Sequence, residues 1–182
     1  MGLDMYLEKH TYVKNWSHQG DGQRHSVQVL RGGVVRSDIK PERVSTIVED
    51  VAYWRKANAV HRWFVAHVQN GVDDCRTYDV SREQLEELVR TCKEVLAKSE
   101  LVPGDVVNGY TFEDGKEKPI LEAGQRIKDP TAAKALMPTQ SGFFFGLTDY
   151  DERYYEDLQE TVRQLEPVLT EADGEFVYHS SW

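Results

Sequence analysis

The pattern that constrains the fold most is a run of apolar residues at helical spacing directly after a capping sequence. Ser81 and Gln84, three residues apart, form the capping box that begins a helix. Beyond them, apolar side chains recur every three or four positions, and charged residues lie between them. The apolar face consists of Leu85, Leu88, Val89, Cys92, Val95 and Leu96. A helix with one such face must pack on another layer of structure.

Short alternating segments predict the sheet that supplies this layer. Residues 3–13 and 75–80 alternate between apolar and polar side chains, as half-buried strands do. Gly32-Gly33 lies between valine-rich segments and suits a tight hairpin, so we expect an antiparallel meander in the N-terminal part. Residues 143–145, three phenylalanines between glycines, and residues 176–178 predict two further strands.

Three further segments have apolar residues at helical spacing, and two of them predict a helix, whereas the third is ambiguous. Residues 44–53 fit the period of a strand and that of a helix equally well, so their structure stays open. From 54 to 69, apolar residues lie on more than one side, which predicts a central, largely buried helix. A last long helix is expected to begin at Asp149 or Asp151, both good caps, and to be kinked or ended by Pro167.

The order of these elements indicates a single α+β domain over residues 1–182, with a mainly antiparallel sheet packed by about three helices. A hydrophobic content of 40% excludes an intrinsically disordered chain. Residues 99–138 hold four of the six prolines and read as an excursion within the domain. We expect there a small hairpin at Asn108-Gly109 or Asp114-Gly115, and a short helix that begins at Asp129-Pro130.

The charge of the chain restricts its partners. The formal net charge is −9, and residues 1–100 balance to zero, so the whole excess lies in residues 101–182. Binding to nucleic acid needs clustered Lys and Arg to neutralise phosphates, and it is therefore not expected. No apolar run approaches the roughly 20 residues that span a bilayer, and the N-terminus does not resemble a signal peptide. We expect a cytoplasmic protein without membrane partners.

The sequence contains no common catalytic or cofactor motif. GxxxxGK[ST], GxGxxG after a strand, HExxH, CxxC and GxSxG are all missing. We therefore expect no cofactor, no metal and no catalytic residues, and a non-enzymatic protein is favoured over an enzyme. One alternative is a small hydrolase built from Asp73, Asp74 and Cys75, although a turn rich in Asp explains that segment more simply.

A cluster of aromatic and basic residues is the strongest candidate for a ligand site. Tyr53 and Trp54 precede Arg55, Asn58 and Arg62, and the last three would share one face of a helix. Guanidinium groups recognise phosphate and carboxylate, and aromatic rings stack on bases. The cluster predicts one wall of a site for a small anionic, nucleotide-like ligand. The alternative is that these arginines pair with acidic residues of the last helix.

Three small polar residues are expected to form the opposite wall of this site. Thr139, Gln140 and Ser141 precede Gly142, which permits close approach of the backbone. A turn that leads into a strand is the competing interpretation of this segment.

The start of the last helix is strongly acidic. Acidic side chains in a first turn interact favourably with the helix dipole, which is the usual reason for such a pattern. The functional alternative is a surface formed by Glu152, Glu156 and Glu160 that binds and inhibits a basic host protein. The oligomeric state does not follow from the sequence.

Several unusual blocks occur together along the chain, among them MGLDMYL, YWRKANAVHRWFV, PTQSGFFFG, YYEDL and the terminal YHSSW. In this combination the chain resembles a family of small accessory proteins encoded by bacteriophages and prophages. The resemblance implies a protein of the host cytoplasm that is not part of the virion. It further implies a host protein or a small host molecule, including nucleotide signals, as the partner.

Overall fold

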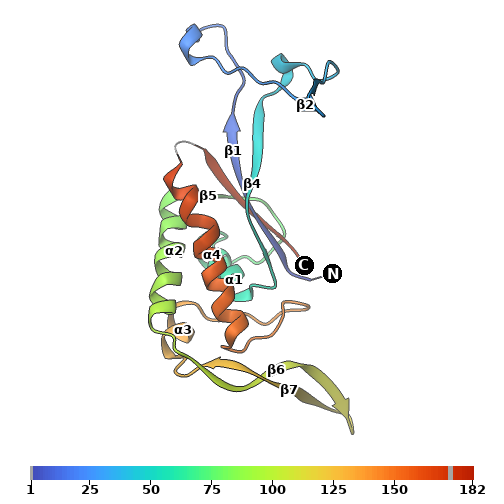
Figure 1. Cartoon of the computed structure of the whole chain (residues 1–182), viewed down its shortest axis with the longest axis vertical. Coiled ribbons are helices and arrows are strands. Elements are labelled where there is room, and N and C mark those ends of the chain that lie inside the picture. The colour runs from blue at the N-terminus through green and yellow to red at the C-terminus, as the bar shows by residue number, and fades with distance from the viewer. Residues whose placement is uncertain (1, 172–173) are drawn as a thin grey trace.

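A four-stranded antiparallel sheet lies at the centre of the molecule (Figure 1). The structure is a computed structural model that describes residues 2–171 and 174–182. The strands are ordered β4 (Thr46–Arg55), β1 (Asp4–Tyr12), β8 (Glu175–Ser181) and β5 (Tyr78–Val80). The first and last strands of the chain are therefore neighbours in the middle of the sheet, and β4 forms one edge.

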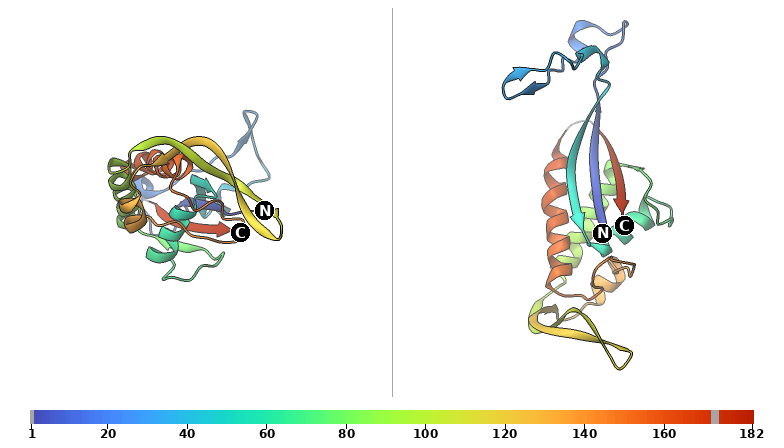
Figure 2. Two further views of the ribbon diagram at one scale, coloured as in Figure 1. Left: turned by 90° about the horizontal axis from the view of Figure 1, so that it is seen from below. Right: turned by 90° about the vertical axis from the view of Figure 1, so that its right-hand side faces the viewer.

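Three helices cover one face of this sheet, as expected for an α+β fold. The helices α2 (Arg82–Ala97) and α4 (Glu152–Thr170) run side by side, and α1 (Asn58–His67) packs beside them (Figures 1 and 2). The core between helices and sheet is aromatic: the rings of Phe64 on α1 and Tyr178 on β8 stack with centroids 3.9 Å apart. No helix in the described part of the chain is both long and apolar enough to cross a membrane.

The caps predicted for α2 and α4 are confirmed. The Ser81 side chain accepts a hydrogen bond from the Gln84 amide, and the Gln84 side chain accepts one from the Ser81 amide. Asp151, one of the two expected caps of α4, accepts hydrogen bonds from the amides of Arg153 and Tyr154. Pro167 lies inside α4, which continues to Thr170, so the proline does not end this helix.

The predicted helix over 54–69 begins too early. Strand β4 continues through Arg55, because Trp54 pairs with Met5 of β1 and buries its ring on the helix side of the sheet. The chain then bends at Lys56, and α1 covers only Asn58–His67. The open stretch 44–53 belongs almost entirely to β4. An apolar residue at a strand end can fit the spacing of a following helix by chance. The helical pattern therefore included Trp54, although this residue lies on β4 before the bend.

The predicted strand at 143–145 is also wrong. Phe144 has a φ of 64°, outside the extended region, and the Phe145 amide donates to the Gly142 carbonyl across a tight turn. Phe145 is buried, whereas Phe143 and Phe144 are exposed. One of the three rings therefore anchors a loop on the core, and the segment joins no sheet.

A long hairpin projects from one end of the molecule (Figure 1). It consists of β6 (Leu101–Glu113) and β7 (Lys116–Ile127), with the turn at Asp114-Gly115, where both residues have positive φ. One of the two expected turn sites is thus correct, but the hairpin is much longer than expected. The short helix α3 (Thr131–Leu136) follows, and Asp129 accepts a hydrogen bond from the Thr131 amide.

A second projection extends from the other end, where β1 and β4 reach beyond the helices (Figure 2). We call residues 14–45 the distal arm. It contains the hairpin of β2 (Leu30–Arg31) and β3 (Val34–Val35) across Gly32-Gly33, and two single 3-10 turns at Asp21–Gln23 and Pro41–Arg43. The hairpin confirms the Gly-Gly signal. The expected meander is incomplete, because β2 and β3 pair only with each other and do not join the central sheet.

Candidate functional site

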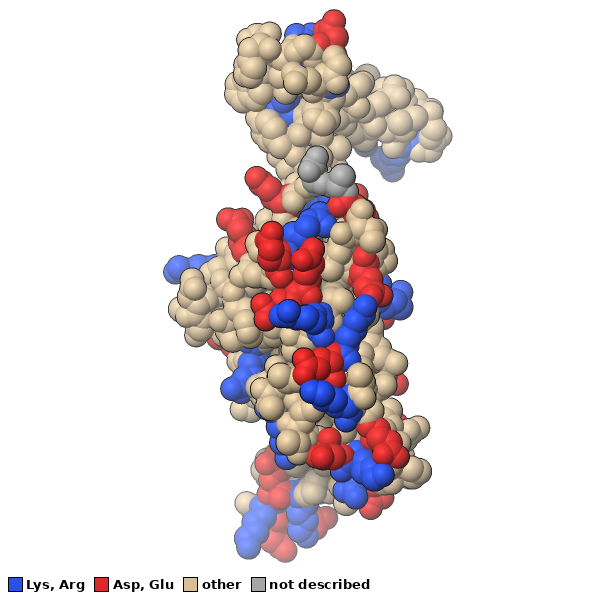
Figure 3. Space-filling view, turned by 90° about the vertical axis from the view of Figure 1, so that its left-hand side faces the viewer, with Lys and Arg blue, Asp and Glu red and all other residues tan. Residues whose placement is uncertain are grey.

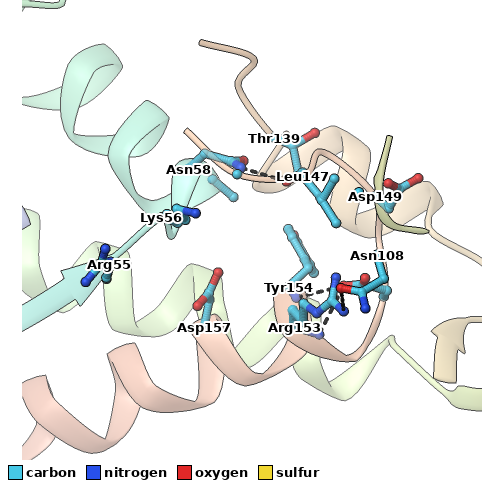
Figure 4. A pocket seen from close by; sticks show the side chains of 14 residues that line it. Arg55, Lys56, Asn58, Asn108, Thr139, Leu147, Asp149, Arg153, Tyr154 and Asp157 are labelled. Carbon is cyan, nitrogen blue, oxygen red and sulfur yellow. Dashed lines mark hydrogen bonds between the residues drawn. The ribbon is translucent and has the colours of Figure 1, made fainter. Parts of the chain in front are cut away.

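A cavity of about 510 Å³ lies where the start of α1, the start of α4, the loop after α3 and the β6–β7 hairpin meet (Figure 4). Its walls combine basic, acidic, amide and apolar side chains. The lining residues are Arg55, Lys56, Asn58, Ala59, Asn108, Gly109, Thr139, Gly146, Leu147, Asp149, Asp151, Arg153, Tyr154 and Asp157.

The bend between β4 and α1 forms the basic wall of the cavity. Lys56 has a φ of 59°, which is uncommon for a residue with a side chain and costs about 1–3 kcal/mol. Its amide donates to the Leu3 carbonyl at 2.8 Å, which holds the bend on β1. Within residues 2–171 and 174–182, the exposed side chains of Arg55 and Lys56 make no hydrogen bond or ion pair. Two cations therefore remain available at this wall.

The first turn of α1 adds partial positive charge to the same wall. The residue before the helix, Ala57, provides no side-chain cap, and Asn58 and Ala59 of the first turn line the cavity. The amides at the start of a helix have no partner within the helix, and the helix dipole is positive at that end. A helix that begins without a side-chain cap and faces a cavity is suited to an anionic group.

Asn58 connects this wall to the loop after α3. Its side-chain amide nitrogen donates to the carbonyls of Phe145 (3.2 Å) and Leu147 (2.8 Å), and its oxygen accepts from the Gln140 amide (3.2 Å). Asn58 is buried, so these bonds hold the loop against α1. Gly146 lies so close that a Cβ at its position would be 3.2 Å from the Lys56 Cβ.

The structure brings part of each predicted wall into one place. Arg55, Asn58 and Thr139 all line the cavity, and the Arg62 guanidinium donates to the Thr139 carbonyl at 3.2 Å from outside it. Arg55 does not share a helical face with Asn58 and Arg62, however, because Arg55 is the last residue of a strand. The expected i, i+3, i+7 face is therefore wrong, although the two segments do meet.

The other predicted ligand residues lie outside the cavity. Trp54 is 3% exposed and donates from its indole nitrogen to the Thr161 hydroxyl at 2.9 Å, so it belongs to the core. The Tyr53 hydroxyl donates to Asp4 on the outer face of the sheet. Gln140 directs its side chain to Asp73 at 2.7 Å, and Ser141 is exposed. These four positions do not form a stacking platform for a base.

An acidic wall faces the basic one across the cavity (Figure 4). Burial, together with the neighbouring carboxylates of Asp151 and Glu156, raises the pKa of the Asp157 carboxyl to about 7. Asp151 is 3% exposed; its Oδ1 caps α4, whereas its Oδ2 has no hydrogen-bond partner in the described structure. Near neutral pH this wall therefore holds a carboxyl that is partly protonated and can donate a hydrogen bond.

The third basic side chain at the cavity, Arg153, is occupied by hydrogen bonds. The Arg153 guanidinium donates to the Val107 carbonyl at 2.9 Å, to Asn108 Oδ1 at 3.3 Å and to Glu122 at 2.8 Å. These contacts fasten the β6–β7 hairpin to the start of α4 and close that side of the cavity. Arg153 thus positions the wall, and Arg55 and Lys56 remain as the unpaired cations.

The acidic residues of α4 do not form a continuous surface. Glu152 accepts a hydrogen bond from the Gln125 amide at 3.1 Å, and Glu160 forms an ion pair with Arg163 one turn further on. Glu156 is exposed. On the side of the molecule that carries α2, red and blue side chains are interspersed over the body (Figure 3). Arg55 and Arg62 do not pair with these acids in the described structure.

The Asp-rich segment before β5 is a fixed turn. Asp73 accepts from Gln140 and contacts His61 Nε2 at 3.0 Å, and His61 Nδ1 lies 2.8 Å from the Tyr178 hydroxyl. Asp74 accepts from the hydroxyl of Tyr78 at 3.0 Å. Burial lowers the pKa of the fully buried His61, while Asp73 opposes that change. Both nitrogens of the imidazole are engaged, so this geometry favours the turn interpretation over a hydrolase.

Two residues of the cavity had no recognisable signal in the sequence. Lys56 lies inside the predicted cluster, but only the bend directs it to the cavity. Asp157 looks like any other acid of a charged helix, and its raised pKa depends on neighbours that the fold provides. Among the described residues, no group of three or more His, Cys, Asp or Glu side chains could hold a metal ion.

Comparison with known proteins adds no relative to this picture. No protein family, curated protein or solved structure matches the chain. The functional argument therefore depends on the geometry of the cavity, and the resemblance to phage accessory proteins stays a prediction.

Proposed function

We propose that this chain is a non-enzymatic protein that binds a small anionic, nucleotide-like ligand in the cavity at the β4–α1 bend. One observation carries the proposal: the bend places two unpaired cations, Arg55 and Lys56, beside the uncapped start of α1 in a single cavity. In line with the sequence resemblance, we propose that it acts as an accessory protein of a phage or prophage in the host cytoplasm.

The chemistry of the walls suggests how such a ligand is oriented. A phosphate or carboxylate group is attracted to Arg55, Lys56 and the amides that follow Asn58 in the first turn of α1, because the Asn58 amide itself donates to the Lys56 carbonyl at 2.8 Å. The remainder of the ligand faces Leu147, and the partly protonated Asp157 carboxyl offers it both a donor and an acceptor. A volume of about 510 Å³ lies within the usual range for small-molecule sites, about 300–1,000 Å³.

The proposal is tested by thermal unfolding in the presence of nucleoside mono- and diphosphates, cyclic nucleotides, inorganic phosphate and uncharged nucleosides. A ligand at 100 times its Kd adds about 2.7 kcal/mol of stability, which raises the melting temperature measurably. We expect at least one phosphorylated compound to raise it and the matching nucleoside to leave it unchanged. A flat panel at millimolar concentrations would contradict the proposal, as would equal effects of nucleotide and nucleoside.

A double variant connects the effect to the cavity. Replacing Arg55 and Lys56 by Gln removes both unpaired cations while it keeps side chains of similar length, and we expect the ligand-induced shift to disappear. The matched control replaces Arg76 and Lys98, two exposed bases away from the cavity, by Gln. This control removes the same charge, so a shift lost in both double variants would indicate only nonspecific attraction of anions.

A further inference from the structure

The distal arm has no hydrophobic core of its own. None of its 32 residues is buried, and only five are half-buried. Five of its large apolar side chains are between 37% and 71% exposed, and they are Trp16, Val29, Leu30, Val34 and Val35. Ordering a residue costs about 1–2 kcal/mol of backbone entropy, which is normally offset by burial. The arm as a free projection lacks that compensation.

The surface area of the whole molecule also indicates that surface is available for an association. The described structure exposes 11,496 Å², whereas a compact protein of this mass exposes about 9,000 Å². The two projections (Figure 2) contribute to the excess of about 2,500 Å², which is larger than the roughly 800 Å² that each partner contributes to a standard interface. Enough surface is therefore available for a stable association.

The charge of the arm differs in sign from that of the remaining chain. The arm carries three acidic side chains, Asp21, Asp38 and Glu42, against six basic ones, a net of +3. The total of −9 leaves −12 for the remaining residues. The basic residues of the arm are Lys14, Arg24, Arg31, Arg36, Lys40 and Arg43. The body of another copy of the same chain, with its opposite net charge, is thus an electrostatic complement of the arm.

The edge strand β4 provides the place for such a contact. Near its inner end the backbone of Tyr53 is covered by the Gln164 side chain, which bonds to both its amide and its carbonyl. Towards the arm, residues 46–50 are exposed, among them Ile47 and Val48, and no described strand pairs with their outer edge. An exposed apolar edge is a template for pairing with another chain.

We propose that two copies associate by antiparallel pairing of their β4 edges at residues 46–51, around a two-fold axis. The arm lies beyond one end of this segment and the helical body beyond the other (Figure 2). Antiparallel pairing therefore sets each arm beside the body of the partner. The arm, with its net charge of +3, then lies beside a body with a net charge of −12, and its apolar side chains lose contact with water. The arrangement is self-complementary, as a two-fold interface requires. It does not depend on the proposed ligand.

Sedimentation equilibrium of the full chain from about 1 to 500 µM tests the proposal. We expect twice the 20.9 kDa mass of one chain, with dissociation promoted by high salt. Replacing Leu30 and Val34 by Asp is expected to weaken association at least about 100-fold, because it buries charge in the interface. The matched control places Asp at Tyr110 and Phe112, which are equally exposed on the β6–β7 hairpin, and is expected to leave the mass unchanged.

Hydrogen exchange gives a second readout that needs no substitution. The amides of residues 46–51 on the outer edge are expected to exchange slowly at concentrations where the dimer forms, and fast on dilution. A mass of one chain at 500 µM would overturn the proposal. The proposed pairing of the β4 edges would be overturned if the chain stayed dimeric after Leu30 and Val34 are replaced by Asp. It would also be overturned if residues 46–51 of the dimer exchanged fast. Binding of the arm to an acidic macromolecule by a monomeric chain would assign the surface to a different partner.

Discussion

The side-chain amide of Gln164 on α4 takes the place of a neighbouring strand for Tyr53 on β4. The Tyr53 amide donates to Gln164 Oε1 at 2.8 Å, and Gln164 Nε2 donates to the Tyr53 carbonyl at 3.2 Å. Both backbone groups of an edge residue are thereby satisfied by one side chain. Natural sheets protect their edges in such ways against unwanted pairing, and here the protection covers only the inner end of β4.

Replacing Gln164 by Leu removes both hydrogen bonds. We expect the free energy of unfolding to fall by about 0.5–1.5 kcal/mol, because water can still reach the exposed Tyr53 backbone. Urea denaturation followed by circular dichroism measures this change. Gln159→Leu, on the same helix and exposed, is the control and is expected to change stability by less than about 0.5 kcal/mol. Equal effects of both substitutions would argue against a specific role of Gln164.

Thr161→Val leaves the buried indole nitrogen of Trp54 without its acceptor. The Thr161 hydroxyl is fully buried, and valine has nearly the same shape, so the change removes a hydrogen bond without creating a cavity. We expect a loss of about 1–3 kcal/mol in urea denaturation. Thr91→Val is a matched control, because the Thr91 hydroxyl also bonds to a carbonyl four residues earlier in its helix, and no buried donor depends on it. A neutral Thr161→Val would contradict this assignment.

Local signals made the starts of α2 and α4 predictable. Ser81 and Gln84 bond to each other, and Asp151 bonds to amides two and three residues further on, so each cap is contained in a few adjacent residues. The bend at Lys56 is different, because its amide bonds to Leu3 and its direction depends on the pairing of Trp54 with Met5. Contacts between residues 50 positions apart leave no periodic trace in a sequence.

In the candidate site, too, features that depend on local sequence were predictable, whereas features that depend on contacts between distant residues were not. The residue types predict Arg55 and Asn58 on one wall of a ligand site and Thr139 on the other, and all three line the cavity. It could not indicate that Trp54 faces the core, because that depends on which side of the sheet the helices cover. The importance of Asp157 likewise comes from burial beside Asp151, which only the packing of α4 produces.

Asp157→Asn is expected to stabilise the protein at pH 8 by about 1–2 kcal/mol. The pKa of Asp157 is raised to about 7 from an ordinary value near 3.8, so between these pH values the folded state keeps a proton that the unfolded state has lost. The contribution of Asp157 to the free energy of unfolding therefore falls as the pH rises from 4 to 7, and it is constant above that. Asparagine does not titrate, so the gain should grow across this range.

Urea denaturation at pH 5, 6, 7 and 8 checks this dependence. Asp149→Asn is the control, because Asp149 lines the same cavity but is exposed. A gain from Asp157→Asn that is constant between pH 5 and pH 8 would show that the carboxyl does not titrate in this range.

His61 should have the opposite influence on pH dependence. Burial lowers its pKa below the ordinary 6.5. At mildly acidic pH the unfolded state therefore binds a proton at this histidine, whereas the folded state does not. Its contribution to the free energy of unfolding is complete above pH 6.5 and decreases as the pH falls below that value. Histidine NMR signals as a function of pH are expected to show His61 neutral where exposed histidines are already charged. An ordinary pKa for His61 would contradict its burial between Tyr178 and Asp73.

The pairing of β1 with β8 sets the order of events during synthesis. Strand β1 leaves the ribosome about 160 residues before its partner on one side, residues 175–181. At about 5–20 residues per second, β1 waits roughly 10–35 s before the central ladder can close. Throughout that interval its apolar face is available to chaperones and to other nascent chains. A release of chains before residue 175 should therefore yield aggregating material, and translation speed should affect the yield of native protein.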